Sequence, residues 1–168
     1  MKFYDVIKSR RSIRGYLSKP IPEDALQRIG EAVSLSPSAC NLQPWKFLIV
    51  VNPEFRQKIC KVYNQPWLAQ APAIAVVFGN HEICWKRLNG QPIVDIDVGI
   101  AMEHLVLAAA AECLGSCWIC AYDIAAMDEA LQVTPPWTTL AISPLGYPAV
   151  KTEAPKRKPL SEVFEVMI

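Results

Sequence analysis

The chain has 168 residues, of which 52% are hydrophobic and 20% charged, and its formal net charge is +1 at pH 7. This length predicts a single domain over residues 1–168, large enough to fold without disulfides or a metal. The balanced charge excludes a disordered chain and argues against a partner nucleic acid or a polybasic membrane binder.

The longest apolar runs, 71–79 and 105–111, are too short to cross a membrane, so no membrane association is expected. The first residues lack a signal-peptide core, because Asp5 and Lys8 interrupt it. A cytoplasmic location is therefore expected. In that compartment the six cysteines are expected to be thiols rather than disulfides.

Hydrophobic periodicity predicts alternating elements in the first half of the chain. Residues 3–9 form a short helix, and a second helix begins at 21–24, with Leu26, Ile29 and Val33 at helical spacing. Loop-forming residues follow. Further along, we expect a strand over 46–51, a helix that begins at Pro53, and a fully buried strand over 73–78.

The second half contains the longest expected helix, over 95–114. Asp95 or Asp97 is expected to cap its start, and Gly115 stands where a C-terminal glycine belongs. A strand over 117–121, a helix over 124–132 and a last core strand over 138–143 follow. The alternation of helices and strands predicts a layered α/β or α+β domain.

Two groups of basic residues are candidate phosphate ligands. Arg10, Arg11 and Arg14 flank the hydroxyl of Ser12, and residues 156–158 are Lys, Arg and Lys. Guanidinium groups with a hydroxyl suit a phosphomonoester, because they supply charge, bidentate geometry and donors. Two solvated charged faces are the alternative, and spacing alone does not bring the groups together.

Residues 37–45, Pro-Ser-Ala-Cys-Asn-Leu-Gln-Pro-Trp, form a second candidate site directly before a predicted strand. The two prolines restrict the path of the loop. Ser38, Asn41 and Gln43 offer neutral donors and acceptors that suit a ring with several carbonyls and ring nitrogens. The alternative is an ordinary turn.

The spacing Cys113-x3-Cys117-x2-Cys120 formally matches the cluster motif of radical S-adenosylmethionine enzymes. Only 48 residues follow Cys120, too few for the barrel of those enzymes. A structural zinc site needs four ligands, and a redox Cys-x-x-Cys pair is typical of a helix N-terminus. Buried apolar thiols are therefore the favoured interpretation, and no metal is expected.

Taken together, these segments resemble the nitroreductase family of short, FMN-dependent flavoenzymes. The resemblance rests on 10–14, on 37–45, on 97–99 leading into 114–119, and on 144–148 followed by 157–160, in order along almost the whole chain. It implies an α+β fold, with a central mixed, mainly antiparallel sheet flanked by helices, in an intertwined homodimer. The surplus apolar residues would then cover a dimer interface.

The resemblance also implies a role for each site residue. Arg10, Ser12 and Arg157 would hold the FMN phosphate, with Arg11 and Lys158 assisting. Arg14 would lie near the pyrimidine end of the flavin, where a cation stabilises negative charge on reduction. The remaining implied contacts are Pro37, Ser38, Ala39 and Asn41 from the partner subunit, Gln65 at the ring or ribityl chain, and Trp118, Ile119, Cys120 and Ala121 near the flavin N5.

The implied activity is transfer of reducing equivalents from NADH or NADPH through FMN to a small acceptor such as a nitroaromatic or quinone. No catalytic side chain beyond the flavin is required, although Arg14 and Cys120 would be nearby. Cys120 departs from the family, which often has glycine or an acidic residue there. The alternatives are a flavin-binding or flavin-degrading protein without general nitroreductase activity, and a thiol or cluster protein that uses the three cysteines.

Overall fold

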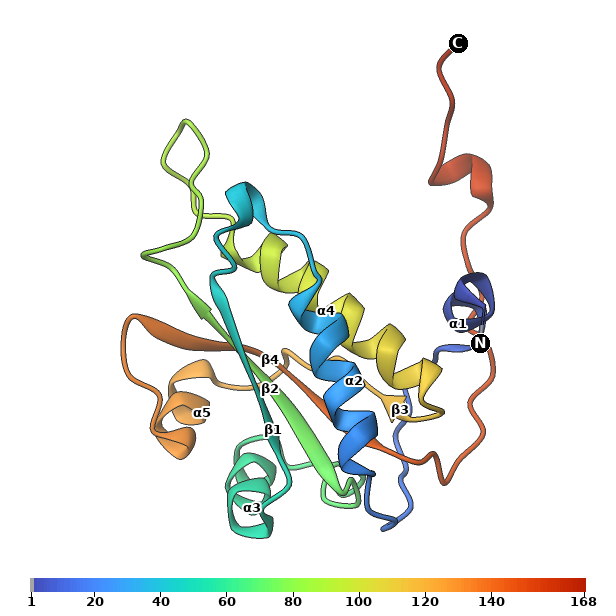
Figure 1. Ribbon diagram of the computed structural model, residues 1–168. Coiled ribbons are helices and arrows are strands. Elements are labelled where there is room, and N and C mark those ends of the chain that lie inside the picture. The colour runs from blue at the N-terminus through green and yellow to red at the C-terminus, as the bar shows by residue number, and fades with distance from the viewer. Residues whose placement is uncertain (1) are drawn as a thin grey trace.

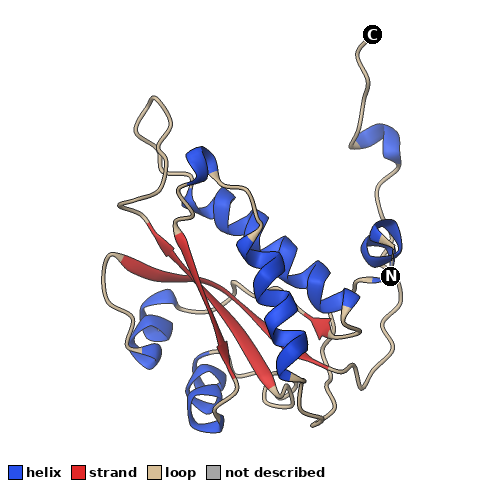
Figure 2. Ribbon diagram, in the orientation of Figure 1, coloured by secondary structure: helices blue, strands red, loops and turns tan. Residues whose placement is uncertain are grey.

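The computed structural model describes residues 2–168, which form a four-stranded sheet with helices packed on both faces (Figures 1 and 2). The elements in chain order are α1 (Phe3–Ser9), α2 (Glu23–Ser34), the 3-10 turn η1 (Ala39–Asn41), β1 (Trp45–Val50), α3 (Pro53–Val62), β2 (Ala73–Asn80), α4 (Val94–Ala111), β3 (Gly115–Ser116), α5 (Ile124–Leu131), β4 (Trp137–Gly146) and the 3-10 turn η2 (Leu160–Glu162). The expected α+β class is confirmed.

The strand order is β1-β2-β4-β3, and each neighbouring pair is antiparallel. The expectation of a mixed sheet is therefore wrong, because every pair of neighbouring strands is antiparallel. The parallel pairing in the described chain is a single isolated bridge between Ser12 and Ser116. That bridge brings the N-terminal basic segment to the sheet edge formed by β3.

Strand β2 is buried along its whole length, as its apolar run predicts. Side chains alternate between faces in a strand. Ile74, Val76 and Phe78 pack in the core beneath α3 and α5. Ala73 and Ala75 face α2 and α4, where their small size suits the close packing of these two helices. The sheet thus separates two apolar layers.

Helix α4 ends earlier than expected, and Gly115 does not terminate it. Its C-cap is Glu112, and Cys113 adopts the left-handed conformation with φ 60°. The Leu114 N–H donates to the Ala109 carbonyl at 2.8 Å, and the Cys113 N–H donates to Ala110 at 3.1 Å. This is the Schellman arrangement, here with a non-glycine residue at its left-handed position.

The start of α4 also differs from the expectation. Ile93 is the N-cap, and no side chain caps it. Asp95 and Asp97 lie in the first turn, where the helix dipole favours acidic groups. Asp97 is buried and bonded to another segment, as described below. A side chain does cap α5, where Asp123 accepts a hydrogen bond from the Ala126 N–H at 2.8 Å.

The strand expected over 117–121 is shorter and displaced. Only Gly115–Ser116 pairs continuously with β4, and Ile119 returns to form one bridge with Ile142. Trp118 and Cys120, on either side of Ile119, stay exposed. This segment therefore presents alternate residues outward without belonging to a regular strand.

Residues 149–168 run along the outside of the fold and are exposed throughout. They pass α1 and then extend away from the sheet and its helices (Figure 1). Their last part is apolar, with Phe164 at 63% and Ile168 at 116% relative exposure. None of the helices within residues 2–168 combines the length and apolarity of a membrane span.

Candidate functional site

A cavity of about 360 Å³ brings together basic residues from both ends of the chain. Four arginines and two hydroxyl side chains line it, and they come from the N-terminal segment and from the C-terminal segment. The lining residues are Arg10, Arg11, Ser12, Arg14, Thr152, Glu153, Pro155 and Arg157. Four of the five residues predicted to hold the phosphate thus share one cavity with Arg14, whereas the fifth, Lys158, does not line it.

Backbone pairing explains why these distant segments meet. The Ile13 N–H donates to the Ser116 carbonyl at 2.9 Å, which ties the N-terminal segment to β3. On its other side, the Leu17 N–H donates to Tyr147 and the Ala149 N–H donates to Gly15. The chain leaving β4 therefore runs beside residues 15–17 and delivers Thr152 and Arg157 to the cavity.

The arginines differ in how free their donors are. Arg11 Nη1 already donates to the carbonyls of Lys8 and Arg10, each at 2.7 Å. Arg11 is therefore partly engaged in holding the end of α1. Glu153 contributes one negative charge to the lining, so four guanidinium groups against one carboxylate leave the cavity strongly positive.

The Cys117 thiol is buried beside this cavity. Burial raises its pKa above the ordinary value, while Arg14, the Ser12 hydroxyl and Arg10 act in the opposite direction. The Cys117 N–H donates to Ser143 Oγ at 3.2 Å. A buried thiol with a raised pKa is a poor nucleophile, so Cys117 serves packing beneath the cavity.

Residues 118–121 begin two residues after β3. Ile119 is 4% exposed and belongs to the core with Ile142, so its side chain faces away from solvent. Trp118 is 40% exposed, and its indole Nε1–H donates to Cys120 Sγ at 3.1 Å. Trp118, Cys120 and Ala121 therefore form the accessible surface of this segment.

The loop that contains Pro37, Ser38, Ala39 and Asn41 lies at the opposite end of α4. Cys40, Asn41 and Gln43 all have positive φ values, of 51°, 54° and 48°. Such conformations are costly for residues other than glycine and persist only where other contacts impose them. Two contacts do so here: the Gln43 N–H donates to Ser38 Oγ at 2.9 Å, and the Ala39 N–H donates to Asp97 Oδ1 at 3.1 Å.

Helix α4 begins near this loop and ends near β3 (Figure 1). Asp97, which holds the loop, lies in its first turn, whereas Ala110 lines a cavity of about 300 Å³ together with Arg10 and Arg11. At 1.5 Å per residue, these two points on the helix are about 20 Å apart. One chain therefore does not bring its own loop and its own cavity together.

Gln65 lies on an exposed turn outside the basic cavity. Its N–H donates to the Tyr63 carbonyl at 2.9 Å. Two residues further on, Trp67 contacts Arg14, with the guanidinium carbon 5.9 Å from the ring centroid. Sequence reasoning missed Trp67 because nothing local connects it with Arg14.

Thr152 was also missed, since it lies in a polar segment without periodicity.

The three cysteines of the Cys113-x3-Cys117-x2-Cys120 spacing do not converge, because Cys117 is buried while Cys113 and Cys120 are exposed. Across residues 2–168, no group of three or more His, Cys, Asp or Glu side chains is placed to hold a metal ion.

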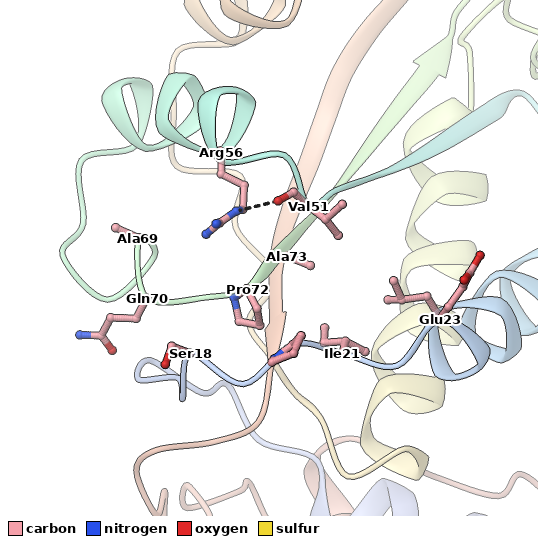
Figure 3. Close-up of a pocket in the computed structure, with 11 residues that line it drawn as sticks. Ser18, Ile21, Glu23, Val51, Arg56, Ala69, Gln70, Pro72 and Ala73 are labelled. Carbon is pink, nitrogen blue, oxygen red and sulfur yellow. Dashed lines mark hydrogen bonds between the residues drawn. The ribbon is translucent and has the colours of Figure 1, made fainter.

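A larger cavity, of about 800 Å³, lies where the segment 18–23 approaches the ends of β1 and β2 (Figure 3). It contains none of the predicted site residues. Its one arginine, Arg56, donates to the carbonyls of Val51 at 3.3 Å and Ala71 at 2.7 Å. This guanidinium ties α3 to two strand ends, so the basic cavity remains the better candidate site.

Comparison with known proteins agrees with this architecture. A solved nitroreductase family protein from Clostridium novyi NT is 33% identical, with a TM-score of 0.82 over 88% of this chain and 86% of that one. An FMN-dependent nitroreductase from Clostridium difficile R20291 is 25% identical, with a TM-score of 0.81 over 97% and 98%. An FMN reductase [NAD(P)H] from Bacillus subtilis is 33% identical over 129 residues, which are 66% of this chain and 51% of that protein.

The sequence pattern of the nitroreductase family itself matches residues 7–62 and 55–147. These ranges include the N-terminal arginines, the loop after α2 and the segment that follows β3. The chain therefore belongs to the nitroreductase family of oxidoreductases.

Proposed function

We propose that the protein is an FMN-dependent oxidoreductase that passes reducing equivalents from NADH or NADPH to a small acceptor such as a nitroaromatic or quinone. The observation that carries this proposal is the convergence of Arg10, Ser12, Arg14 and Arg157 on one cavity. The names of the Clostridium difficile and Bacillus subtilis relatives support the choice of FMN, and the latter also supports NAD(P)H.

The donor set of the cavity fits the phosphate of FMN. A phosphomonoester dianion needs several charge-assisted donors in a fixed arrangement, and guanidinium groups provide both. Arg10 and Arg157 come from separate segments, and Ser12 adds a hydroxyl to the same cavity. Lys158 follows Arg157 directly and is exposed, so it can add to the positive field.

FMN, when bound, supplies the two-electron redox chemistry, and the chain supplies binding and electrostatics. Arg10, Ser12 and Arg157 hold the phosphate. Arg14 holds a positive charge at the pyrimidine end, where it stabilises negative charge. Trp118, Cys120 and Ala121 present the exposed surface against which the flavin ring would lie. This contact requires no acid or base from the segment.

We propose further that the site is completed in a homodimer. The loop at 37–43 lies about 20 Å along α4 from the basic cavity, so it would serve the FMN of a second copy. A groove of about 670 Å³ between α1, α2 and α4 supports this arrangement, because it is lined mainly by apolar residues such as Phe3, Ile100 and Leu107. Phe3 and Ile100 are 65% and 36% exposed in the single chain.

The decisive experiment is to purify the protein and measure its absorbance, followed by NADH and NADPH oxidation with a quinone and with a nitroaromatic. The proposal predicts flavin absorbance that is released on denaturation as FMN, and acceptor-dependent turnover. Colourless protein that does not take up added FMN would overturn it. Consumption of the flavin without reduction of either acceptor would identify a flavin-degrading protein instead.

A further inference from the structure

Arg14 is held by an aromatic side chain that no part of the proposed function uses. Its guanidinium carbon lies 5.9 Å from the centroid of the Trp67 ring, within the range of a cation–π contact. Within residues 2–168, Arg14 forms no salt bridge, and it is exposed to solvent. Trp67 is therefore the main contact that restricts the position of this charge.

The Trp67 ring is fixed by its own surroundings. It packs edge-on against Tyr63, with the ring centroids 6.0 Å apart and an angle of 76° between the planes. It also packs against the small core cluster of Ile13, Tyr16 and Ala71. The next residue, Leu68, is fully buried. A rigid ring thus faces a long, flexible side chain, so the contact lowers the number of positions available to Arg14.

We propose that Trp67 is a positioning residue for Arg14, holding its guanidinium where it acts on the pyrimidine end of the flavin. This inference rests on the proposed function, since it concerns the same site. A cation fixed in one place stabilises developing negative charge better than a mobile one, because less reorganisation is needed. Trp67 therefore tunes FMN affinity and reduction potential through Arg14, without touching the phosphate.

Two substitutions separate this role from packing. Trp67→Phe keeps an aromatic face for Arg14, whereas Trp67→Leu keeps apolar bulk and removes that face. We expect Trp67→Leu to weaken FMN binding about two- to fivefold, the range of a solvent-accessible cation–π contact. It should also lower the midpoint potential of the bound flavin, while Trp67→Phe stays near the wild type in both measurements.

Arg14→Leu provides the coupling test and leaves Trp67 intact. In the Arg14→Leu background, Trp67→Leu should have no further effect on either quantity, because the partner charge is already gone. Equal effects of Trp67→Phe and Trp67→Leu, or an undiminished effect of Trp67→Leu in the Arg14→Leu background, would overturn the inference. If Trp67→Leu does not fold, Trp67→Met, which also keeps apolar bulk and removes the aromatic face, takes its place in both arms of this comparison.

A measurement without flavin distinguishes this inference from the proposed function. In the full-length wild-type chain, ring currents of Trp67 should shift the Arg14 side-chain protons upfield, and Trp67→Leu should remove the shift. An absent shift would overturn the contact whatever the protein binds. Suppose that the shift is present and the protein takes up FMN, but the substitutions at Trp67 and Arg14 show no thermodynamic coupling. That result would overturn only the positioning role. Failure of every form to bind FMN would overturn both proposals.

Discussion

Ile13 lies directly against Gly115, so that a Cβ atom on Gly115 would be 2.8 Å from Ile13 Cγ1 and 2.9 Å from Ile13 Cβ. Both of these Ile13 atoms are close to the backbone and cannot swing away freely. The glycine thus allows residues 10–14 to approach β3 closely enough for the hydrogen bond from Ile13 to Ser116. Its function is close approach rather than helix termination.

We therefore expect Gly115→Ala to destabilise the protein by about 1–3 kcal/mol, the usual cost of overpacking a filled site. It should also weaken FMN binding, because the basic segment is displaced. Gly30→Ala is the matched control, since a Cβ there meets nothing within 4 Å in helix α2. That change should stabilise by about 0.5–1 kcal/mol. Urea unfolding and FMN titration would measure both, and equal behaviour of the two variants would contradict the account.

The phosphate role of the basic cavity predicts a selective defect in Arg10→Ala. Loss of a charge-assisted hydrogen bond should weaken FMN binding about tenfold or more. Lys8→Ala is the control, because Lys8 is exposed and does not line the cavity. Riboflavin lacks the phosphate, so its affinity should be the same for Arg10→Ala and the wild type. A matching loss of riboflavin affinity would place Arg10 elsewhere on the flavin.

The hydrogen bond to Asp97 is expected to stabilise the loop at 37–43. Asp97→Ala removes the acceptor of the Ala39 N–H and should destabilise by about 1–3 kcal/mol. Asp97→Asn keeps a side-chain oxygen for that donor, and among the described residues the second carboxylate oxygen has no partner to lose. Limited proteolysis should therefore cut the loop in the alanine variant and spare the asparagine variant. Equal cleavage of both would show that this hydrogen bond does not hold the loop.

Alkaline pH should destabilise the protein. Burial raises the pKa values of Tyr16, Tyr122, Cys60 and Cys117 above their ordinary values. The folded chain then keeps protons that the unfolded chain loses, so unfolding releases protons and stability falls as pH rises. The decline should begin near pH 8.5, where unfolded cysteines titrate, and steepen above about pH 10, where unfolded tyrosines do.

Tyr122→Phe isolates one part of this pH dependence. It should make the alkaline decline shallower, with Tyr4→Phe as a control at an exposed position. At pH 7 the variant should be about 1 kcal/mol more stable than the wild type, because the buried Tyr122 hydroxyl has no hydrogen-bond partner within residues 2–168. Parallel stability curves for Tyr122→Phe and the wild type between pH 8 and 11 would contradict this assignment.

Local patterns were sufficient for most elements of the fold. The spacing of Leu26, Ile29 and Val33 predicts α2, and the unbroken apolar run at 73–78 predicts the doubly buried β2. The end of α4 was misplaced because Gly115 is a typical terminator. Cys113 takes the left-handed position instead, and Gly115 is needed for tertiary packing that no local pattern reveals.

The candidate site was accessible from sequence only in part. Spacing could not bring residues 10–14 and 157 together, because the connection depends on how β4 continues beside residues 15–17. The resemblance to a family supplied that expectation. Trp67 escaped notice because its partner Arg14 is 53 residues away and the contact involves a ring face rather than a motif. Asp97 looked like a helix cap, although it holds a different loop.

The length of α4 predicts that two different variants can complement each other in the proposed dimer. In that dimer each subunit would give its basic cavity to one flavin and its loop to the other, so a defect at either end of the helix would damage a different site. Mixed dimers of an Arg10→Ala subunit and an Asp97→Ala subunit would contain one doubly defective site and one intact site. Exchange of subunits between the two variants should therefore restore wild-type FMN affinity at one of the two sites of each mixed dimer.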